Sequence, residues 1–454
     1  MGVKTLLADP KKAILKLAWP MMIAMSLQTV YNVVDAIWVS GLGSDALSAV
    51  GFFFPFFFAL IAIATGLGVG GGAFISQYIG AKNKKLADSV ATHTFVLTIV
   101  VFIIICIPLM FFSEHIFVAL GAGSIIHLLG PYAKIIFGGS FFIFFSMVAN
   151  AVLRAEGDAK RSMYALMVGA GLNIVLDPLF IYTFGFGVSG AAIATVISVF
   201  VASLIIAYWL FFKSDSYLNI NFRSFKFDWF IVKQIFSVGI PTALQQFSMA
   251  VMMLFLNYFL VFVGGTDAVA VFSTGWRVVT FAILPLVGVA TAVVSVSGAA
   301  FGAKKFNNLK IAFLFSTKLG LIIAVVGGVL TFVFAPQIAF LFTFSKNSAH
   351  IAPQLIAFLR TICWFYPFTP LGMFSSSFFQ GVGLGIRSLI ITLLRTLVFV
   401  LLFCLLFTFV FSFGEFGVWL GVVIGNGLGS VIAFGWAYKT INSFLKTNSA
   451  TSKK

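Results

Sequence analysis

The sequence predicts an all-α polytopic membrane protein, with twelve transmembrane helices arranged as two pseudo-symmetric six-helix lobes. Three observations lead to this fold class. The 454 residues are 61% hydrophobic and only 9% charged, whereas soluble domains carry about 25% charged residues. Apolar runs of about 20 residues recur along the whole chain, and the two halves of the chain repeat each other.

The apolar runs define the expected spans and leave no room for a soluble domain. A helix crosses the hydrocarbon core of a bilayer with about 20 residues. The longest polar connection lies near residues 213–233. The spans expected from these runs are residues 14–40, 47–75, 88–112, 129–152, 163–184, 188–212, 234–263, 269–297, 311–334, 352–381, 388–411 and 415–441.

The positively charged residues lie mainly in the loops on one side of the membrane. The net charge is +16, and nearly all Lys and Arg residues outside the spans fall on one side if the twelve spans alternate. This pattern is the positive-inside rule, so we expect a multi-pass protein of the plasma membrane with both termini in the cytoplasm. It explains the charge without a nucleic-acid partner. The three Cys residues lie inside apolar spans and the four His residues lack metal-ligand spacing, so we expect no disulfide framework. We also expect no enzyme activity and no cofactor.

The repeat predicts how the lobes are organised. Residues 43–50 parallel residues 265–272, and residues 79–82 parallel residues 301–304. Both halves have six spans and start on the same side, and parallel repeats of this kind build transporters with a central site between two lobes. The predicted organisation is an N-lobe at residues 1–212, a cytoplasmic linker at 213–233, a C-lobe at 234–441 and a cytoplasmic tail at 442–454.

One span carries polar residues that suggest a binding site. Asn173 and Asp177 are four residues apart, so they share a helix face. A carboxylate inside a span costs roughly 3 kcal/mol on insertion scales and indicates function by default. Pro178 lacks an N–H, so the carbonyl of Ile174 loses its helical partner beside that face.

A second acid and a hydroxyl complete this candidate site. Asp35, in the first span, is the only other acid well inside a span, and Thr195 follows in the sixth span. Carboxylate, amide and hydroxyl oxygens suit a hard cation such as Na+, and two carboxylates in one apolar cavity suit proton exchange. The alternative is that both acids are buried polar contacts that hold helices together.

The repeat offers an internal control for these two interpretations. It aligns Asp35 with Asn257, and the C-lobe counterparts of the other polar residues are also uncharged. A purely structural requirement would treat both lobes alike, so the asymmetry favours a chemical site in the N-lobe. Asn173, Asp177, Thr195 and Asn150 align with Phe399, Phe403, Val422 and Ser376, respectively.

Prolines and basic residues inside the spans are less specific. Pro20 in the first span matches Pro241 in the seventh, which predicts either a structural kink or a mobile hinge. Most of the basic residues inside spans are expected to snorkel toward the membrane surface, although Arg277 is also a candidate for the C-lobe cavity. These basic residues are Lys134, Arg277, Lys318, Arg360 and Arg395.

Together these residues resemble the multidrug and toxic compound extrusion (MATE) family, in particular its DinF-like branch. The resemblance covers nearly the whole chain, and the Leu-Asn-x-x-x-Asp-Pro segment is its most specific part. It rests on Pro20, Gln28, Asp35 and the segments 80–82, 154–158, 171–178 and 187–195. It implies two six-helix lobes and export of drugs in exchange for inward-moving H+ or Na+.

The resemblance also implies roles for individual residues. Asp35, Asn173, Asp177 and Thr195 correspond to the cation-coupling site of the N-lobe. Tyr132 and Asn150 are expected beside this site, and Met25 and Gln28 are expected to line the drug cavity. The seventh and tenth spans offer only uncharged polar residues, namely Gln245, Gln246, Asn257 and Ser375 to Ser377, which argues against a cation site in the C-lobe.

We therefore predict a secondary active multidrug efflux antiporter that exports organic, mostly cationic and amphipathic compounds by alternating access, as a monomer. The coupling ion, H+ or Na+, stays open at this point. The first alternative is a flippase for lipid-linked precursors, which needs cationic side chains in the central cavity, and Arg277 and Arg360 are its best candidates. A non-transporting receptor or structural membrane protein does not explain the asymmetry of the acids.

Overall fold

The computed structural model describes residues 2–213, 216–223, 225–344 and 348–451, and these residues are almost entirely helical. The first half contains a short N-terminal helix and six spans. The spans are α2, α3, α4 with α5, α6, α7 and α8. Their bounds, with intervening π-helices and one 3-10 helix, are α1 Gly2–Leu6, α2 Pro10–Ser40, α3 Ser44–Gly80, α4 Lys84–Val101, η1 Phe102–Cys106, α5 Ile107–Ala119, η2 Gly123–Ile125, α6 Ile126–Ala155, α7 Ala159–Pro178, η3 Leu179–Thr183, α8 Gly187–Ala207 and η4 Tyr208–Phe212.

The second half supplies six further spans. Its elements are α9 Trp229–Gly302, α10 Phe306–Val333, α11 Ala335–Thr343, η5 Ala349–Ile351, α12 Ala352–Ile362, η6 Cys363–Phe368, α13 Thr369–Gly381, α14 Gly385–Leu393, η7 Leu394–Val398, α15 Phe399–Leu405, η8 Leu406–Val410 and α16 Gly414–Thr451. Among the described residues, ten helices are long and apolar enough to cross a membrane. The 74-residue α9 supplies two spans, and α12, η6 and α13 form one further span, which gives the twelve that the sequence predicts.

Three spans differ in detail from the expected pattern. The seventh and eighth spans are one helix, α9, whose only non-helical residue is Gly265, with φ 65° and ψ −154°. The tenth span is interrupted by the 3-10 helix η6, which contains Pro367 and precedes Pro370 in the first turn of α13. A proline lacks the N–H of the helical ladder, which accounts for the interruption.

The helix ends follow from local capping. The side chains of Asp9, Asn83, Asp158 and Asp228 accept hydrogen bonds from the first backbone N–H groups of α2, α4, α7 and α9. Such caps satisfy orphan N–H groups and fix where a helix begins. The cap at Asp228 starts α9 at Trp229, so the linker ends five residues earlier than expected, and α16 extends past residue 441 to Thr451.

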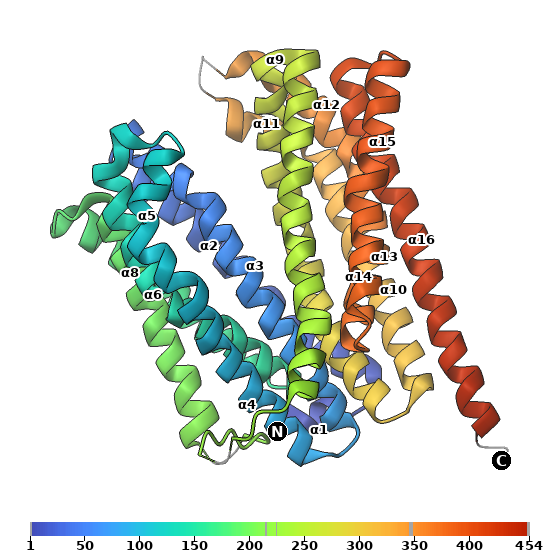
Figure 1. The fold of residues 1–454 in the computed structure, drawn as a ribbon. Helices are drawn as coiled ribbons and strands as arrows, with labels where there is room; N and C mark the ends of the chain where they lie inside the picture. The colour runs from blue at the N-terminus through green and yellow to red at the C-terminus, as the bar shows by residue number, and fades with distance from the viewer. Residues whose placement is uncertain (1, 214–215, 224, 345–347, 452–454) are drawn as a thin grey trace.

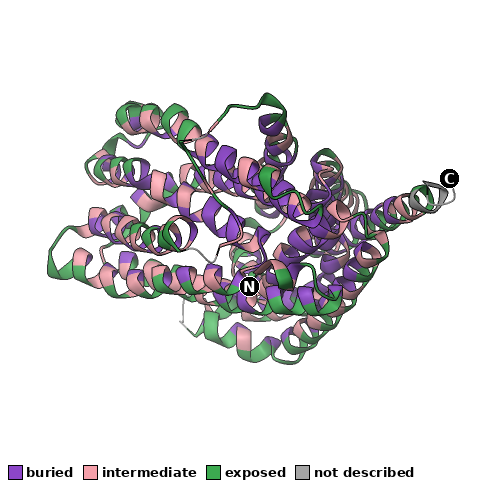
Figure 2. Cartoon of the chain, turned by 90° about the horizontal axis from the view of Figure 1, so that it is seen from below, coloured by how far each residue is buried: buried purple, intermediate pink, exposed green. Residues whose placement is uncertain are grey.

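The lobes meet at one end of the molecule and diverge toward the other (Figure 1). We call the end that carries the N-terminus and the linker the linker end, and the opposite end the far end. The N-lobe and the C-lobe form separate bundles in this view, with α9 in the C-lobe bundle. Seen from the linker end, buried residues lie on the helix faces that meet inside the molecule, and exposed residues surround them (Figure 2).

Small residues let the two lobes pack closely at the linker end. Gly66 lies against Gly239, and Gly70 lies against the carbonyl of Ile235. Close backbone approach of this kind is the usual role of glycine in membrane helices. Two hydrogen bonds also cross the interface, from Gln77 Nε2 to the Gly381 carbonyl at 2.8 Å and from Tyr78 Oη to Gln234 Oε1 at 3.0 Å.

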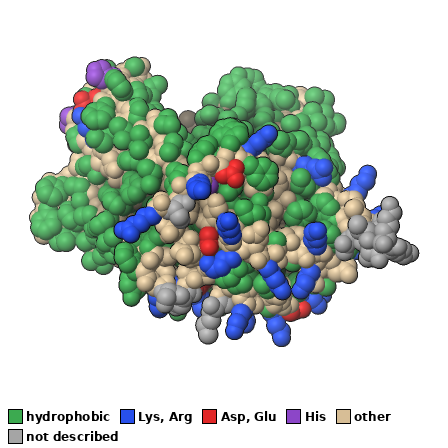
Figure 3. Space-filling view, turned by 60° about the horizontal axis from the view of Figure 1, so that its bottom comes forward, with side chains coloured by type: hydrophobic (Ala, Val, Ile, Leu, Met, Phe, Trp, Pro, Cys, Tyr) green, Lys and Arg blue, Asp and Glu red, His purple; other side chains and the backbone are tan. Residues whose placement is uncertain are grey.

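The linker is held against the N-lobe by buried or partly buried polar groups. The Ser216 hydroxyl donates to Glu156 Oε2 at 3.0 Å. The backbone N–H of Asn219 donates to Asp88 Oδ1 at 2.8 Å, and that of Asp228 donates to His93 Nε2 at 2.9 Å. Lys and Arg side chains spread over the same end of the molecule (Figure 3).

Candidate cation and drug site in the N-lobe

The candidate site lies where the regular α-helical pattern of the fifth span ends. α7 runs to Pro178, and the chain continues as the π-helix η3 from Leu179 to Thr183. A π-helical turn rearranges the backbone hydrogen bonds and is frequent at functional sites. Asp177 therefore occupies the last turn of α7, directly before this change in helix geometry.

Asp177 is completely buried, and neither of its carboxylate oxygens has a hydrogen-bond partner among the described residues. The half-buried Asp35, on α2, is the neighbouring acid with which it interacts electrostatically. A buried carboxylate without partners is costly unless something compensates its charge. Two neighbouring acids from different helices are well placed to share a proton or to bind a cation.

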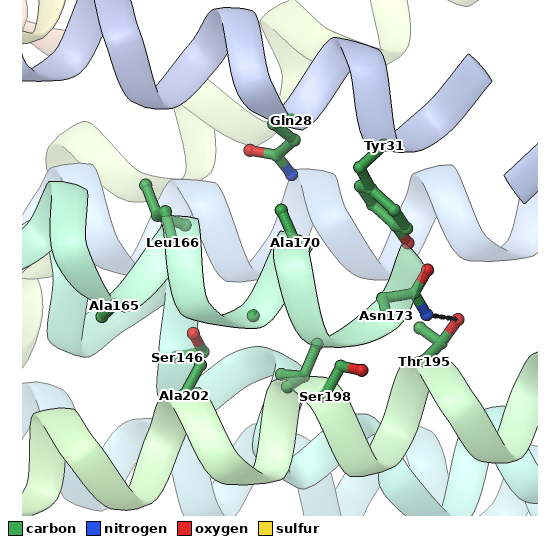
Figure 4. Close-up of a pocket in the computed structure, with 12 residues that line it drawn as sticks. Gln28, Tyr31, Ser146, Ala165, Leu166, Ala170, Asn173, Thr195, Ser198 and Ala202 are labelled. Atoms are coloured by element: carbon green, nitrogen blue, oxygen red, sulfur yellow. Dashed lines mark hydrogen bonds between the residues drawn. The ribbon is translucent and has the colours of Figure 1, made fainter. Parts of the chain in front are cut away.

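Asn173 and Thr195 extend the polar group toward a cavity. Asn173 Nδ2 donates to Thr195 Oγ1 at 3.4 Å, while Asn173 Oδ1 is buried without a partner in the described chain. The cavity contains about 430 Å³ of empty space, including its open side. Its lining comes from α2, α6, α7 and α8 and consists of Gln28, Tyr31, Ser146, Ala165, Leu166, Gly169, Ala170, Asn173, Thr195, Ser198, Val199 and Ala202 (Figure 4).

The structure thus brings several of the expected site residues together. Asn173 and Thr195 are in contact, Gln28 faces the same cavity, and Asp35 lies beside Asp177. The unpartnered oxygens of Asp177 and Asn173 are the donor types that Na+ accepts. No group of three or more His, Cys, Asp or Glu residues suited to a metal ion occurs among the described residues.

Three expected residues do not line this cavity. The ring of Tyr132 packs edge-on against Phe53 at a centroid distance of 5.2 Å, and Tyr132 interacts electrostatically with both acids. Asn150 is buried and donates from Nδ2 to the Ser146 carbonyl at 2.8 Å. Met25 is partly buried against the hydrophobic core.

Pro20, the expected hinge, is buried inside α2, which continues as a helix on both sides of it. The structure describes one conformation, so mobility at Pro20 stays a prediction.

Three residues of the cavity that carry hydroxyl groups, Tyr31, Ser146 and Ser198, were not predicted from the sequence. The hydroxyl of Tyr31 points toward Asn173 in Figure 4. Tyr31 precedes Asp35 by four residues and therefore shares its helix face, a signal that was available in the sequence. Ser198 is buried, and its hydroxyl has no partner among the described residues.

The C-lobe has a polar group at the positions that the repeat aligns with Asn150 and Ser162. Gln245 Nε2 donates to Ser388 Oγ at 3.1 Å, and its Oε1 accepts from Ser376 Oγ at 3.2 Å. This group is uncharged and satisfied by internal hydrogen bonds. The expectation that most in-span cations snorkel is wrong for Arg395, which is only 6% exposed; its side chain is enclosed by α13 and α16, so it cannot reach the membrane surface.

Comparison with known proteins identifies the family. The multidrug export protein MepA of Staphylococcus aureus (strain NCTC 8325 / PS 47) is 31% identical over 296 residues, which is 65% of each chain. The chain therefore matches slightly less than two thirds of the length of this relative.

Two solved structures match almost the whole chain. One is described as the outward-facing conformation of a multidrug resistance MATE family transporter of the MOP superfamily. It is 46% identical, covers 98% of this chain and 99% of that chain, and superposes with a TM-score of 0.95. A MOP superfamily transporter from Pyrococcus furiosus Vc1 (DSM3638) is 46% identical over 98% of both chains, with a TM-score of 0.94. Residues 20–179 and 241–406 match the MatE family model, and the chain belongs to this family of transporters.

Proposed function

We propose that this protein is a secondary active antiporter that exports organic, mostly cationic and amphipathic compounds in exchange for H+ or Na+. The observation that carries this proposal is the pair of neighbouring acids, Asp35 and Asp177, beside an uncharged cavity inside one lobe. The names of the relatives support drug export as the direction of transport. The DinF-like branch stays a prediction.

The orientation follows from the loop charges. Because Lys and Arg gather at the linker end, we assign this end and both termini to the cytoplasm. The described conformation is closed at the linker end, where Gly66 meets Gly239, and the lobes diverge at the far end (Figure 1). In this assignment the far end faces outward, so a coupling ion enters from outside.

In the proposed cycle, binding of the coupling ion at Asp177 allows the N-lobe site to close. A proton on Asp177 removes the cost of a buried charge, and Na+ compensates the same charge by coordination. With either ion bound, closing the site around the ion costs less free energy. Closure then reduces the space available to the drug. The membrane potential adds about 2.3 kcal/mol per inward positive charge at 100 mV, which helps to drive drug export.

The residues of the cavity fit the proposed drug class. Tyr31 supplies an aromatic face, and Gln28, Ser146 and Ser198 supply neutral polar groups. An aromatic ring attracts organic cations through its quadrupole. A lipid-linked pyrophosphate would instead need cationic groups, and neither Arg277 nor Arg360 lines this cavity. The guanidinium of Arg360 lies over the ring of Phe332 at 5.5 Å.

Drug flux in proteoliposomes tests this function directly. Purified protein should move a fluorescent organic cation against an imposed inward gradient of H+ or Na+, and the gradient that drives transport identifies the coupling ion. Efflux from a pump-deficient host should give the same substrate range. Absence of flux under both gradients, with correctly folded and monomeric protein, would remove the antiporter proposal.

A further inference from the structure

The C-lobe buries an arginine that has no carboxylate to balance it. Arg395 lies in the π-helix η7 and is only 6% exposed, and its one hydrogen bond among the described residues runs from Nη1 to Asn426 Oδ1 at 3.2 Å. A guanidinium has five N–H donors and keeps its charge in a protein interior. A buried charge without compensation is costly.

No acid of the C-lobe is near enough to pair with Arg395. Residues 234–441 contain only two acids, Asp267 and Glu415. Asp267 pairs with His350 at 3.2 Å, in exposed surroundings. Glu415 precedes Asn426 by eleven residues in α16, which corresponds to about 16 Å along the helix axis.

Two neighbouring polar groups also lack partners. Asn426 Nδ2 and Ser430 Oγ are buried and have no hydrogen-bond partner in the described chain. They lie one helical turn apart on α16, so they share a face. A side-chain Cβ at Gly372 would come within 2.7 Å of Ser430 Oγ and 2.8 Å of Arg395 Nε, so the hydroxyl and the guanidinium occupy the same small region.

The repeat shows that this region corresponds to the N-lobe cavity. In the alignment that pairs Asn150 with Ser376 and Asn173 with Phe399, Arg395 takes the place of Gly169. Asn426 and Gly372 take the places of Val199 and Ser146. Gly169, Val199 and Ser146 all line the N-lobe cavity.

The C-lobe is built to hold the arginine at this position. A Cβ at Gly372 would lie 2.5 Å from Arg395 Cδ, and one at Gly429 would lie 2.5 Å from its Cα. Both glycines therefore leave space for the stem of the side chain. The N-lobe has a cavity next to two acids, whereas the C-lobe has, at the matching place, a buried cation with two unpartnered donor groups in the same region.

From these observations we propose that the C-lobe binds a small monovalent inorganic anion, of the chloride class, at Arg395, Asn426 and Ser430. An anion compensates the guanidinium charge and accepts hydrogen bonds from the unpartnered groups. Water would satisfy the donors but leave the charge uncompensated. The near-complete burial of all three residues excludes a bulky lipid headgroup and favours a single small ion.

The thermal midpoint of the purified full-length protein tests the proposal. Replacing gluconate by chloride at constant cation concentration and ionic strength should raise the midpoint by about 2 °C or more, because a ligand of the folded state stabilises it. Crystals grown with bromide should show an anomalous scattering peak beside the Arg395 guanidinium. A midpoint that is equal in both salts, without a bromide peak, overturns the proposal in favour of water.

Two variants separate a bound anion from a general salt effect. Asn426→Asp places a carboxylate beside Arg395, so it should fold and lose the chloride response, because the protein then supplies its own anion. Arg360→Met removes an exposed cation of the same lobe and should keep the full response. A chloride response that survives in Asn426→Asp, or that disappears equally in Arg360→Met, would contradict the assigned site.

Arg395→Met provides a second measurement, since it replaces the charge by an apolar side chain of similar length. This variant should show the same midpoint in chloride and gluconate, and its bromide peak should be lost. If Arg395→Met fails to fold, the chloride dependence of the thermal midpoint is measured in Ser430→Ala instead. This variant should respond to chloride more weakly than the natural chain but still respond. An unchanged dependence on chloride concentration in Ser430→Ala would remove this hydroxyl from the site.

Discussion

Gly80 of the N-lobe packs directly on the backbone of Ala299 in the C-lobe, so closely that a Cβ atom at residue 80 would overlap the Ala299 carbonyl. Gly302 lies in the same way against the backbone of Gln77. The two glycines occupy equivalent positions in the repeat, next to Ala81 and Ala303. At the closed linker end, the two lobes therefore meet through a pair of reciprocal backbone contacts that leave no room for a side chain at either glycine.

Closure of the linker end should fail when this contact is filled. Gly80→Val forces the lobes apart, and overpacking of this kind costs about 1–3 kcal/mol, which shifts a two-state equilibrium about 5- to 150-fold. Spin labels at Lys84 and Asn308 should then report longer distances across the linker end, and drug transport should fall. Gly51→Val is the matched control, because Gly51 lies in the same helix and has no atom within 4 Å of its Cβ position. Unchanged label distances in Gly80→Val would show that this contact does not set the conformation.

The membrane orientation can be checked by labelling single cysteines from outside. Cysteines at Ser44 and Ser348, both at the far end, should react with an impermeant thiol reagent in intact cells, whereas one at Asn308 should react only after permeabilisation. The native cysteines are buried and should give little background. The reverse pattern would place the linker end outside.

The sequence predicts the repeated architecture well because its signals are local. Lys82 and Lys304, aligned in the repeat, both adopt a left-handed backbone with φ of 57° and 55°, so each lobe makes the same turn after its second span. The spans follow from apolar length alone. The continuous α9 could not be predicted, because a single glycine, Gly265, absorbs the turn that a loop was expected to make.

The candidate site and the other buried polar contacts were only partly predictable, because the sequence shows local signals but not which helices pack together. Asp35, Asn173 and Asp177 are conspicuous because polar groups inside a span are costly. The burial of Arg395 and the partner of Glu156 depend on which helices pack together, and spacing along the chain contains no such information. Arg395 is enclosed by α16, and Glu156 meets Ser216 of the linker, 60 residues away.

The buried contact between Glu156 and Ser216 of the linker should make the stability of the folded protein depend on pH. Burial raises the pKa of Glu156 from 4.5 to about 7, against the opposing effect of the Ser216 hydrogen bond. The unfolded chain releases this proton at lower pH than the folded protein. The contribution of Glu156 to stability is therefore full below about pH 4.5 and is lost as the pH rises through about 7.

Glu156→Gln should remove this dependence, since the amide cannot ionise. Above pH 7 the variant should be more stable than the natural chain by about 1–3 kcal/mol, and its thermal midpoint should vary less between pH 5 and 8. Asp45→Asn, at an exposed acid of the far end, serves as the control and should keep the original pH dependence. A pH profile that is identical in Glu156→Gln would mean that the linker contact does not titrate in this range.

The asymmetry of the lobes predicts which substitutions stop transport. Asp35→Asn should reduce gradient-driven drug efflux to near background, whereas Asn257→Ala, at the aligned position of the C-lobe, should leave most of it. Ser376→Ala should also retain transport, but it removes part of a buried hydrogen-bonded group and should cost about 1 kcal/mol of stability. Efflux must therefore be compared at equal amounts of folded protein. Equal damage in both lobes would contradict an N-lobe coupling site.

Asp177 is the residue whose role can be tested most sharply. Its carboxylate is buried without a partner, so we expect it to bind and release the coupling ion rather than to hold helices together. Asp177→Asn keeps nearly the same shape but can neither titrate nor offer a charge to Na+. The variant should fold, reach the membrane and bind drug, because Asn173 and Thr195 keep their contact at the cavity. It should lose flux driven by a pH or Na+ gradient in proteoliposomes, while exchange of drug for drug without a gradient continues. Normal gradient-driven flux in folded Asp177→Asn would return this residue to a structural role, and the orphan oxygens would then need another explanation.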